Sequence, residues 1–500
     1  MEIPSLTTMI TINIFEKTIR FDVTSNYIGG KIMKKEVIND LIKIVGDKWV
    51  DQNPERVLSY SRESTNDNYS LVAPEPIAGS VVVKAADAED ISQILKYANQ
   101  KKINVIARGA GTALSANTIP AQESIILSLE RLNKILELDE ENMLLKCEAA
   151  VSLGDLNERL KSNDHLYFPL HPGDEGAQVG GMAAMNAGGV RAVKHGIMRN
   201  QVLGMEVVLP TGEIVNYGGS EGKLLKNNAG YDLMQLMIGS EGTLGIITQV
   251  CLKLYPEPKA NGTLIVAFDS REDAFASVPA ILKKGIIPMA LEYVEKDEIE
   301  LAAADIGKKW PAQNGKYFLM IMLAEAEEDD LFEIGAQIDQ ITAEHNAVDM
   351  LIAQTSAERK AILDIRSHIL PAISDKIIDS PDVTVPRSKL CEYLNILNEL
   401  EEKYNTRCPV VAHAGDGNLH VIILKEDGSK PDYYESLKKD IYQNAVDIGG
   451  TITGEHGVGE MRLEYLKMMY SERELEIMEK IKDAFDPNDI LNSGKSIIRK

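Results

Sequence analysis

The hydrophobic positions near the start of the chain change from a helical arrangement to short apolar runs. Aliphatic residues between 34 and 60 recur at the spacing of one helix face, which predicts a helix over that stretch. An apolar run at 80–86 predicts a strand, and the next segment, 87–102, has the acidic first turn and basic last turn of a helix. A second apolar run at 103–109 completes a predicted β-α-β unit.

The following stretch, 124–256, carries short apolar runs separated by turn residues, which favours sheet over long helices. Strands are predicted at 124–129 and 142–151. A hairpin is predicted over 201–218, with Pro-Thr-Gly at its turn, and a later strand is expected to end at Pro256.

The pattern changes again after residue 257. Strands and helices then alternate in the order β-α-β-β-α-β, which is typical of a ferredoxin-like α+β layer. Two helices and a strand pair are expected next, and the last 50 residues are expected to be mostly helical. The segments are 262–270, 271–284, 291–296, 317–326 and 328–345 for the layer, 356–375 and 389–404 for the helices, and 409–425 for the strand pair.

The N-terminal segment does not resemble a signal peptide, because residues 1–30 lack a basic region followed by an apolar one. The amphipathic helical pattern begins just after Met33. We therefore expect Met33 to open the folded part and residues 1–32 to be an N-terminal extension. The alternative is a genuine N-terminal strand pair, since TMITINIF and KTIRFDV both have strand-like patterns.

Composition and charge narrow the class of protein. The chain has 500 residues, 44% hydrophobic and 26% charged, as in a globular protein of several domains. Its 53 basic and 76 acidic residues give a net charge of −23, which argues against nucleic acid or an anionic membrane as the main partner. The negative net charge does not exclude an anionic small molecule as the substrate. No apolar run is long enough to predict a transmembrane helix.

The cysteines carry no metal or cluster signature. None of the 4 cysteines lies in a C-x-x-C spacing, so the chain has no iron–sulfur motif and no cysteine zinc ribbon. Scattered cysteines suit a reducing compartment rather than a disulfide framework, and we expect a cytoplasmic location.

Three glycine-rich loops are the first candidates for chemistry: 106–120, 171–189 and 239–248. In the first loop, Gly109 and Gly111 follow a predicted strand and allow the backbone to approach a ligand closely, as in an anion-binding nest. This loop alone is equally explained as a tight turn, and it lacks both the dinucleotide fingerprint and the P-loop lysine. Together the loops predict an extended cofactor with a diphosphate and a planar ring.

Two histidine motifs follow. In VVAHAGDGNLHVIIL (410–424), His413 and His420 flank a hairpin turn, which would bring both imidazoles to one divalent metal ion. The alternative is a pair of edge-strand histidines. In TGEHGVG (453–459), Glu455 supplies a carboxylate ligand, and His456 is free to act as a base near neutral pH.

These five motifs, in this order, resemble the FAD-linked 2-hydroxyacid dehydrogenases of the vanillyl-alcohol-oxidase type, in particular the D-lactate dehydrogenase and glycolate oxidase FAD-subunit group, over about 35–500. The resemblance implies an α+β fold: a PCMH-type FAD-binding domain of two subdomains, a ferredoxin-like cap and a C-terminal helical segment that returns to the FAD. The implied boundaries are 33–256, 257–459 and 460–500.

The resemblance also implies the residues that hold FAD. The pyrophosphate would lie on the first loop, and the flavin would lie on the other two loops and the C-terminal segment. The residues are Arg108, Gly109, Ala110, Gly111, Thr112, Gly180, Gly181, Asn186, Gly189, Glu241, Gly242, Ile246, Asn492 and Lys495. The chain departs from the family at Ala107, Ala116-Asn117 and Ser493, and it has no histidine in 106–120, so we expect non-covalent FAD.

For the reaction, the resemblance implies that His413, His420 and Glu455 hold a divalent metal, either zinc or alternatively manganese or iron. The metal would bind the hydroxyl and a carboxylate oxygen of a small D-2-hydroxyacid and lower the hydroxyl pKa. His456 would take the hydroxyl proton as hydride passes from C2 to flavin N5. Arg366 is a candidate carboxylate clamp, with a surface helix position as the alternative, and Asn418 a candidate polar contact. His368 and Lys389 are weaker candidates.

The expected activity is oxidation of D-lactate or glycolate to the 2-oxoacid, with electrons passed to an electron-transfer flavoprotein or an iron–sulfur subunit. A homodimer is compatible with the sequence. The rival substrate is D-2-hydroxyglutarate, for which Lys376 or Arg387 would have to bind the distal carboxylate. A non-catalytic FAD subunit of a larger oxidase and a metal-dependent hydrolase are alternatives of other classes; the first should lack the histidine motifs, and the second leaves the glycine-rich loops unexplained.

Overall fold

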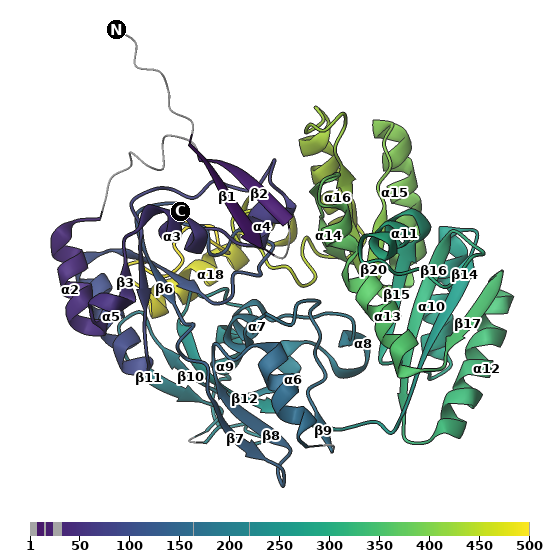
Figure 1. Cartoon of the computed structure of the whole chain (residues 1–500), viewed down its shortest axis with the longest axis horizontal. Helices are drawn as coiled ribbons and strands as arrows, with labels where there is room; N and C mark the ends of the chain where they lie inside the picture. The colour runs from purple at the N-terminus through teal and green to yellow at the C-terminus, as the bar shows by residue number, and fades with distance from the viewer. Residues whose placement is uncertain (1–7, 15–16, 24–32, 164, 220, 500) are drawn as a thin grey trace.

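A computed structural model describes residues 8–14, 17–23, 33–163, 165–219 and 221–499. Two sheets with their helices form the N-terminal part, and a third sheet forms a second part beside it (Figure 1). The architecture is α+β, as predicted.

The first sheet has the order β3-β4-β6-β5, in which β4 and β5 run parallel to β6. Helix α5 connects β4 to β5 and begins at Asp87, whose side chain accepts a hydrogen bond from the Asp90 backbone N–H. The predicted β-α-β unit is therefore confirmed. The bounds are β3 Val50–Asp51, β4 Val81–Lys84, α5 Ala88–Lys101, β5 Asn104–Arg108 and β6 Ser124–Ser128.

The helix predicted over 34–60 is wrong in its length. Helix α2 (Lys35–Val45) ends at Gly46, whose φ of 89° a side chain would oppose. Helix α3 (Pro54–Tyr60) begins anew, with Pro54 in its first turn and the Asn53 side chain accepting from two backbone N–H groups. The apolar spacing was continuous, but glycine and proline divide the segment.

The second sheet is antiparallel, with the order β11-β10-β12-β8-β7. The predicted hairpin is confirmed, since β10 pairs with β11 across the Pro-Thr-Gly turn. The sequence analysis missed β7, none of whose residues is buried, so that the strand lacks an apolar run. The bounds are β7 Ile135–Asp139, β8 Leu144–Glu148, β10 Val202–Val208, β11 Ile214–Tyr217, β12 Ile246–Lys253, and, beside the sheet, α6 Leu153–Lys161, β9 Leu166–Tyr167, α7 Val179–Met185, α8 Ala192–His195, α9 Met234–Met237 and β13 Tyr255–Pro256.

The third sheet has seven strands in the order β17-β14-β16-β15-β20-β21-β19. Its first four strands have the ferredoxin-like order, with α10 following β14 and α12 following β16, which confirms the prediction. Helix α11 was not predicted. The bounds are β14 Ala260–Phe268, α10 Arg271–Lys283, β15 Ala290–Glu295, α11 Lys296–Asp305, β16 Tyr317–Glu325, α12 Glu328–Glu344 and β17 Asp349–Ala353.

The strand pair predicted over 409–425 is confirmed as a hairpin of β20 (Val410–His413) and β21 (Asn418–Val421), and it extends this sheet beyond β15. The helix predicted over 356–375 is broken at His368 into two. The remaining bounds are α4 Ser64–Asn68, α13 Ser356–Ser367, α14 Ile369–Ile373, β18 Ile377–Asp379, β19 Asp382–Thr384, α15 Leu390–Tyr404, β22 Ile423–Leu424, α16 Tyr434–Asp447, α17 Leu466–Met469 and α18 Glu472–Phe485.

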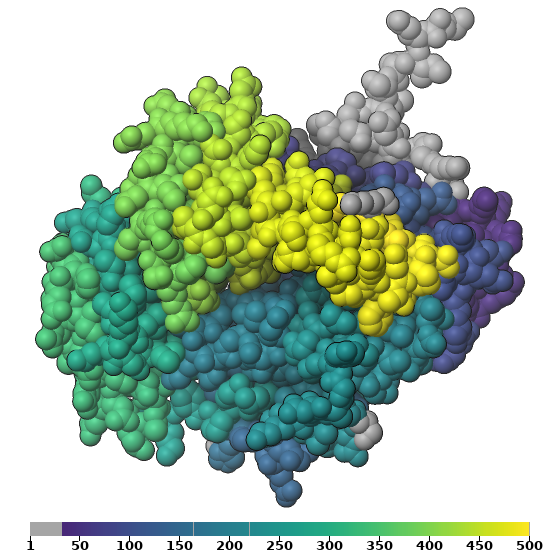
Figure 2. All heavy atoms as spheres, turned by 180° about the vertical axis from the view of Figure 1, so that it is seen from behind, coloured from purple at the N-terminus to yellow at the C-terminus, as the bar shows by residue number. Residues whose placement is uncertain are grey.

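The last 50 residues are less helical than predicted, because their α-helices are the single turn α17 and the 14-residue α18, and the segments on either side are loops and turns. This segment runs from the second part back across the first (Figure 2). Lys482 Nζ donates to the Thr243 carbonyl at 2.8 Å, and Leu491 bridges to Val105 beside the first sheet. Residues from opposite ends of the chain therefore meet in one core.

The N-terminal strand pair is present: β1 (Thr8–Ile14) and β2 (Lys17–Val23) pair antiparallel. The rest of 1–32 lies outside the described residues. Met33 is buried in the core around the first sheet. That 1–32 is an extension stays a prediction. No helix in the described part of the chain is both long and apolar enough to cross a bilayer.

The thiols offer a first prediction. All four cysteines are free; Cys147, Cys251 and Cys408 are buried, and burial raises the pKa of Cys251 to about 11 and that of Cys408 to about 12. Cys391 is partly exposed. We expect a thiol reagent at pH 8 to label Cys391 alone in the native protein and all four in denaturant, measured by mass spectrometry. Rapid native labelling of Cys147 would contradict this packing.

Candidate functional site

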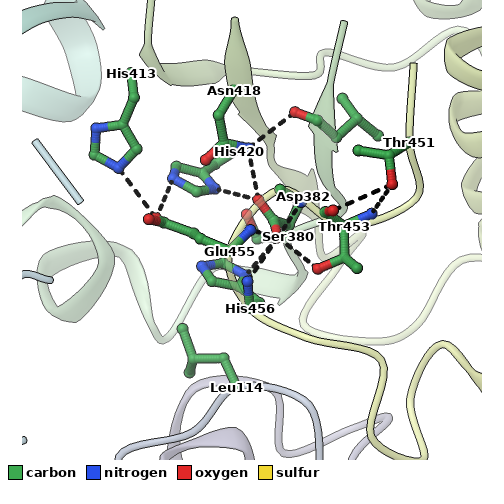
Figure 3. Close-up of polar contacts among 12 residues, drawn as sticks. Leu114, Ser380, Asp382, His413, Asn418, His420, Thr451, Thr453, Glu455 and His456 are labelled. Atoms are coloured by element: carbon green, nitrogen blue, oxygen red, sulfur yellow. Dashed lines mark hydrogen bonds and ion pairs between the residues drawn. The ribbon is translucent and has the colours of Figure 1, made fainter. Parts of the chain in front are cut away.

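Two imidazoles and a carboxylate converge beside the β20–β21 hairpin (Figure 3). Glu455 Oε1 lies 3.1 Å from His413 Nε2 and 3.4 Å from His420 Nε2. The ligand atoms of these residues all lie within 4.8 Å of one another. The hairpin supplies both histidines, and Glu455 comes from the loop after α16.

Asp382 of β19 holds that loop in place. Its Oδ2 accepts from the backbone N–H groups of Gly454, Glu455 and His456 at 2.8–2.9 Å. Its Oδ1 accepts from Asn418 Nδ2 at 2.7 Å. One buried carboxylate thus fixes the backbone of both Glu455 and His456.

The electrostatics of the three converging groups favour a cation among them. Burial alone would lower the pKa of His413, but Glu292 and Glu455 outweigh it and raise that pKa well above its ordinary value. Burial would raise the pKa of Glu455, but His413 and His420 hold it well below its usual range. The two carboxylates that favour a proton on His413 also favour a metal cation at the point where His413 Nε2 faces Glu455. This donor set therefore fits a divalent metal with open positions.

His456 lies next to this group without joining it. Its ring stacks on that of His420, with centroids 4.9 Å apart and planes 6° apart. Its Nδ1 is buried without a hydrogen-bond partner among the described residues and lies 3.9 Å from Asp382 Oδ2. Burial lowers the pKa of His456 to about 4, so the imidazole is neutral at physiological pH.

A glycine-lined cavity adjoins the histidines. Most of the residues predicted to hold FAD line it: Gly109, Ala110, Gly111, Thr112, Gly180, Gly181, Glu241, Gly242, Ile246 and Asn492. Gln178 also lines it, and its buried Oε1 has no hydrogen-bond partner among the described residues. A cavity with glycine walls and an unpaired polar atom fits the FAD that the sequence resemblance implies.

Four predicted FAD residues lie outside this cavity. The Arg108 guanidinium donates to Thr118 Oγ1 at 3.1 Å within its own loop. Asn186 caps α7 and accepts from the Arg199 backbone N–H. Gly189 lines a second cavity, and Lys495 is buried in an ion pair with Glu460. Contact of these residues with FAD stays a prediction.

The second cavity is lined by His413, His420 and Arg366. The Arg366 side chain is 11% exposed, so it is not a surface residue, and its Nη2 lies 2.7 Å from Glu292 Oε2. Asn418 lines neither cavity, since its amide is held by Asp382 and the Val383 carbonyl.

The weaker candidates also have structural partners. His368 lies at the rim of the second cavity, 2.6 Å from Asp305, and Lys389 pairs with Glu392. Among the described residues that line the two cavities, neither Lys376 nor Arg387 appears.

Glu455 and His456 line both cavities. A ligand in the second cavity would therefore meet a ligand in the first beside the His456 ring. This junction is the point at which two bound molecules can exchange a proton or hydride across a short distance.

The sequence analysis missed the carboxylates that position these loops. Glu63 is buried and accepts from the backbone N–H groups of Ala116 and Thr118, which shapes the first glycine-rich loop. Glu241, predicted only as a flavin contact, also accepts from the Val458 and Gly459 N–H groups at 2.8 Å. Such residues are recognised as charged side chains in buried surroundings. A single sequence does not show which positions are buried, so it could not identify them.

Adjacent glycines in the first cavity permit a matched test. A Cβ on Gly180 would lie 2.5 Å from Ala149 Cβ, whereas a Cβ on Gly181 would meet no protein atom within 4 Å. We expect Gly180→Ala to lower the melting temperature of the apoprotein. Gly181→Ala should preserve that temperature and weaken FAD binding by about 10- to 100-fold, since the methyl group enters the ligand space. Fluorimetric FAD titration measures the difference; equal FAD affinity in Gly181→Ala and wild type would contradict this placement.

Two family models match the chain. Residues 79–218 match the FAD binding domain, and residues 257–496 match the C-terminal domain of FAD linked oxidases. The D-lactate dehydrogenase of Archaeoglobus fulgidus is 40% identical over 430 residues, covering 86% of this chain and 94% of that protein. Glycolate oxidase subunit GlcD of Bacillus subtilis is 34% identical over 474 residues, covering 93% of this chain and 97% of that protein.

The fold also has solved counterparts. The structure of p-cresol methylhydroxylase with substrate bound aligns with a TM-score of 0.74 at 17% identity, covering 93% of this chain and 97% of that one. This likeness concerns the fold alone.

Proposed function

The chain belongs to the FAD-linked 2-hydroxyacid dehydrogenases, and on that premise we propose that it oxidises D-lactate or glycolate to the corresponding 2-oxoacid. The observation that supports the proposal is that the candidate metal ligands and the glycine-lined cavity lie next to each other. The His413–His420–Glu455 cluster lies in the second cavity, and His456 stands between it and the glycine-lined cavity.

When bound, FAD would supply a hydride acceptor for substrate C2, and a divalent metal, zinc or alternatively manganese or iron, would supply a Lewis acid for the substrate hydroxyl. His413, His420 and Glu455 would hold the metal. The glycine-rich loops would hold FAD without a covalent bond.

His456 takes the proton of the substrate hydroxyl. Burial lowers the pKa of His456 to about 4, so the ring is neutral at physiological pH and its unprotonated nitrogen is available to accept a proton. Arg366 binds the substrate carboxylate. Its Nε and Nη2 already face Glu292, which leaves Nη1 for the substrate.

One observation favours a monocarboxylic substrate over D-2-hydroxyglutarate. The lysine and arginine among the described residues lining the second cavity are both ion-paired, Lys308 with Asp364 at 2.7 Å and Arg366 with Glu292. A second carboxylate on the substrate would have to displace one of these partners. Lactate and glycolate have a single carboxylate, so neither ion pair has to be displaced.

The reduced flavin must pass its electrons on. We propose an electron-transfer flavoprotein or an iron–sulfur subunit as the acceptor, since no two cysteines of this chain have a cluster spacing.

The test is an anaerobic visible spectrum of the FAD-loaded protein before and after addition of D-lactate, L-lactate, glycolate or D-2-hydroxyglutarate. We expect D-lactate or glycolate to bleach the flavin absorbance and L-lactate to leave it unchanged. A flavin that neither D-lactate nor glycolate bleaches, with zinc or manganese supplied, would refute the substrate assignment. A protein that cannot be loaded with FAD would refute the whole proposal.

A further inference from the structure

Glu292 is a buried carboxylate in direct contact with a proposed metal ligand. Both of its oxygens face His413 Nδ1, at 2.8 and 2.9 Å. Its side chain is 1% exposed, and Arg366 is its counter-ion. A carboxylate this deeply buried is costly unless its charge is paired and its oxygens are hydrogen-bonded, and here both conditions are met.

The sheet fixes this contact. Tyr293 of β15 pairs with Ala412 of β20 in antiparallel register, so Glu292 stands directly opposite His413 on the neighbouring strand. The contact joins residues on two central strands of the seven-stranded sheet, so the relative position of the two side chains is set by backbone pairing rather than by a loop.

The consequence concerns the tautomer of His413. An imidazole that donates its Nδ1–H to a carboxylate presents its lone pair at Nε2. In this site Nε2 is the nitrogen that faces Glu455 Oε1 at 3.1 Å, where the ligand atoms converge. The contact with Glu292 therefore orients the ring so that Nε2 points at the proposed metal position.

His420 lacks an equivalent partner. Its Nδ1 lies 3.5 Å from Asp382 Oδ1 and has no hydrogen-bond partner within the described part of the chain. The carboxylate oxygens of Asp382 instead accept hydrogen bonds from the Asn418 side-chain amide and from the Glu455 backbone N–H. Glu292 therefore fixes the orientation of the His413 ring, whereas no comparable hydrogen bond within the described residues fixes the His420 ring.

We propose that Glu292 is the positioning residue of the metal site: it holds His413 as the Nε2-ligating tautomer, and the ion pair with Arg366 holds the Glu292 carboxylate in place. This inference rests on the proposed function, because it assumes that His413 is a metal ligand. It adds that metal affinity depends on a residue that is not itself a ligand, and it gives Arg366 a second role beyond substrate binding.

The variant Glu292→Gln tests the proposal, since it keeps the side chain's size and removes its charge. We expect the zinc dissociation constant of the FAD-loaded protein to rise by about 10- to 100-fold. Zinc bound after equilibration in buffers of set free zinc concentration gives that constant without an activity assay. Excess zinc should restore substrate oxidation in the variant, as a purely structural defect would not allow.

A matched control lies on the same strand. Glu295 is also buried, and it pairs with Arg271 and Arg407 rather than with a histidine. Glu295→Gln should lower the melting temperature and leave zinc affinity unchanged. If Glu292→Gln does not fold, Glu292→Asp keeps the charge but withdraws it from His413, and its zinc affinity should still fall.

The outcomes separate this inference from the proposed function. Wild-type zinc affinity in Glu292→Gln or Glu292→Asp would overturn the role of Glu292 and leave the metal site intact. A loss of affinity in Glu295→Gln as large as in Glu292→Gln would also overturn it, because burial alone would then explain the effect. A wild-type protein that binds neither zinc nor manganese would overturn the metal site and this role with it, whereas FAD bleaching by substrate tests the activity separately.

Discussion

His420→Ala is expected to lose bound metal and to oxidise D-lactate and glycolate at least about 10³-fold more slowly, while it keeps FAD. The metal's stabilisation of developing charge amounts to several kcal/mol, and each 1.4 kcal/mol is a factor of ten in rate. His420 is the better ligand to remove, because its Nδ1 has no hydrogen-bond partner within the described residues. Removing His413 would instead leave the buried Glu292 without its imidazole.

The measurement combines metal analysis, the flavin spectrum and single-turnover bleaching by substrate. Treatment of the wild type with a chelator should reproduce the loss, and added zinc or manganese should reverse it in the wild type but not in His420→Ala. His345→Ala is the control, since His345 caps the end of α12 outside both cavities. Full activity in His420→Ala, or in chelated wild type shown to be metal-free, would exclude a metal from the reaction.

The motifs that could be predicted from the sequence are those in which neighbours along the chain are also neighbours in space. His413 and His420 meet because a Gly-Asp-Gly-Asn turn joins their strands, and that turn is local information. The glycine-rich loops are visible for the same reason, since each follows from a few consecutive residues. Glu455 and His456 could be identified because they lie within one short motif. Their closeness to the hairpin in space could not be predicted from the sequence.

The positioning residues could not be predicted, because they act across long separations. Glu292 is 121 residues from His413, and Asp382 is 74 residues from His456. Each appears in the sequence as an ordinary acidic residue outside the motifs that suggested chemistry. Arg366 illustrates the same limit: its helix was predicted, but its buried ion pair with Glu292 depends on how that helix packs against the sheet.

The fold followed the same division. The ferredoxin-like order was predictable because its strands are long apolar runs, most of whose positions are buried. The break at Gly46 was not seen, because the apolar spacing continues across it and outweighed the glycine in a pattern-based prediction. The return of the C-terminal segment to Val105 depends on pairing between chain ends, which periodicity cannot reveal.

His456→Asn is expected to lower kcat for D-lactate or glycolate by about 10²- to 10⁴-fold, the usual contribution of a positioned general base. Asparagine retains a polar group of similar length but accepts a proton poorly. The backbone N–H of residue 456 would still donate to Asp382, so the loop should keep its conformation. FAD content, zinc affinity and melting temperature should therefore stay close to those of the wild type.

Stopped-flow bleaching of the flavin under saturating substrate isolates this effect, because it reports the chemical step without the electron acceptor. His171→Asn is the matched control: His171 also lines the second cavity, but it lies outside the ligand cluster and does not line the glycine-rich cavity. We expect its bleaching rate to change by less than about tenfold. If His456→Asn bleaches as fast as the wild type, the hydroxyl proton leaves by another route, and the neutral imidazole at the junction of the two cavities serves to pack against His420 rather than to accept a proton.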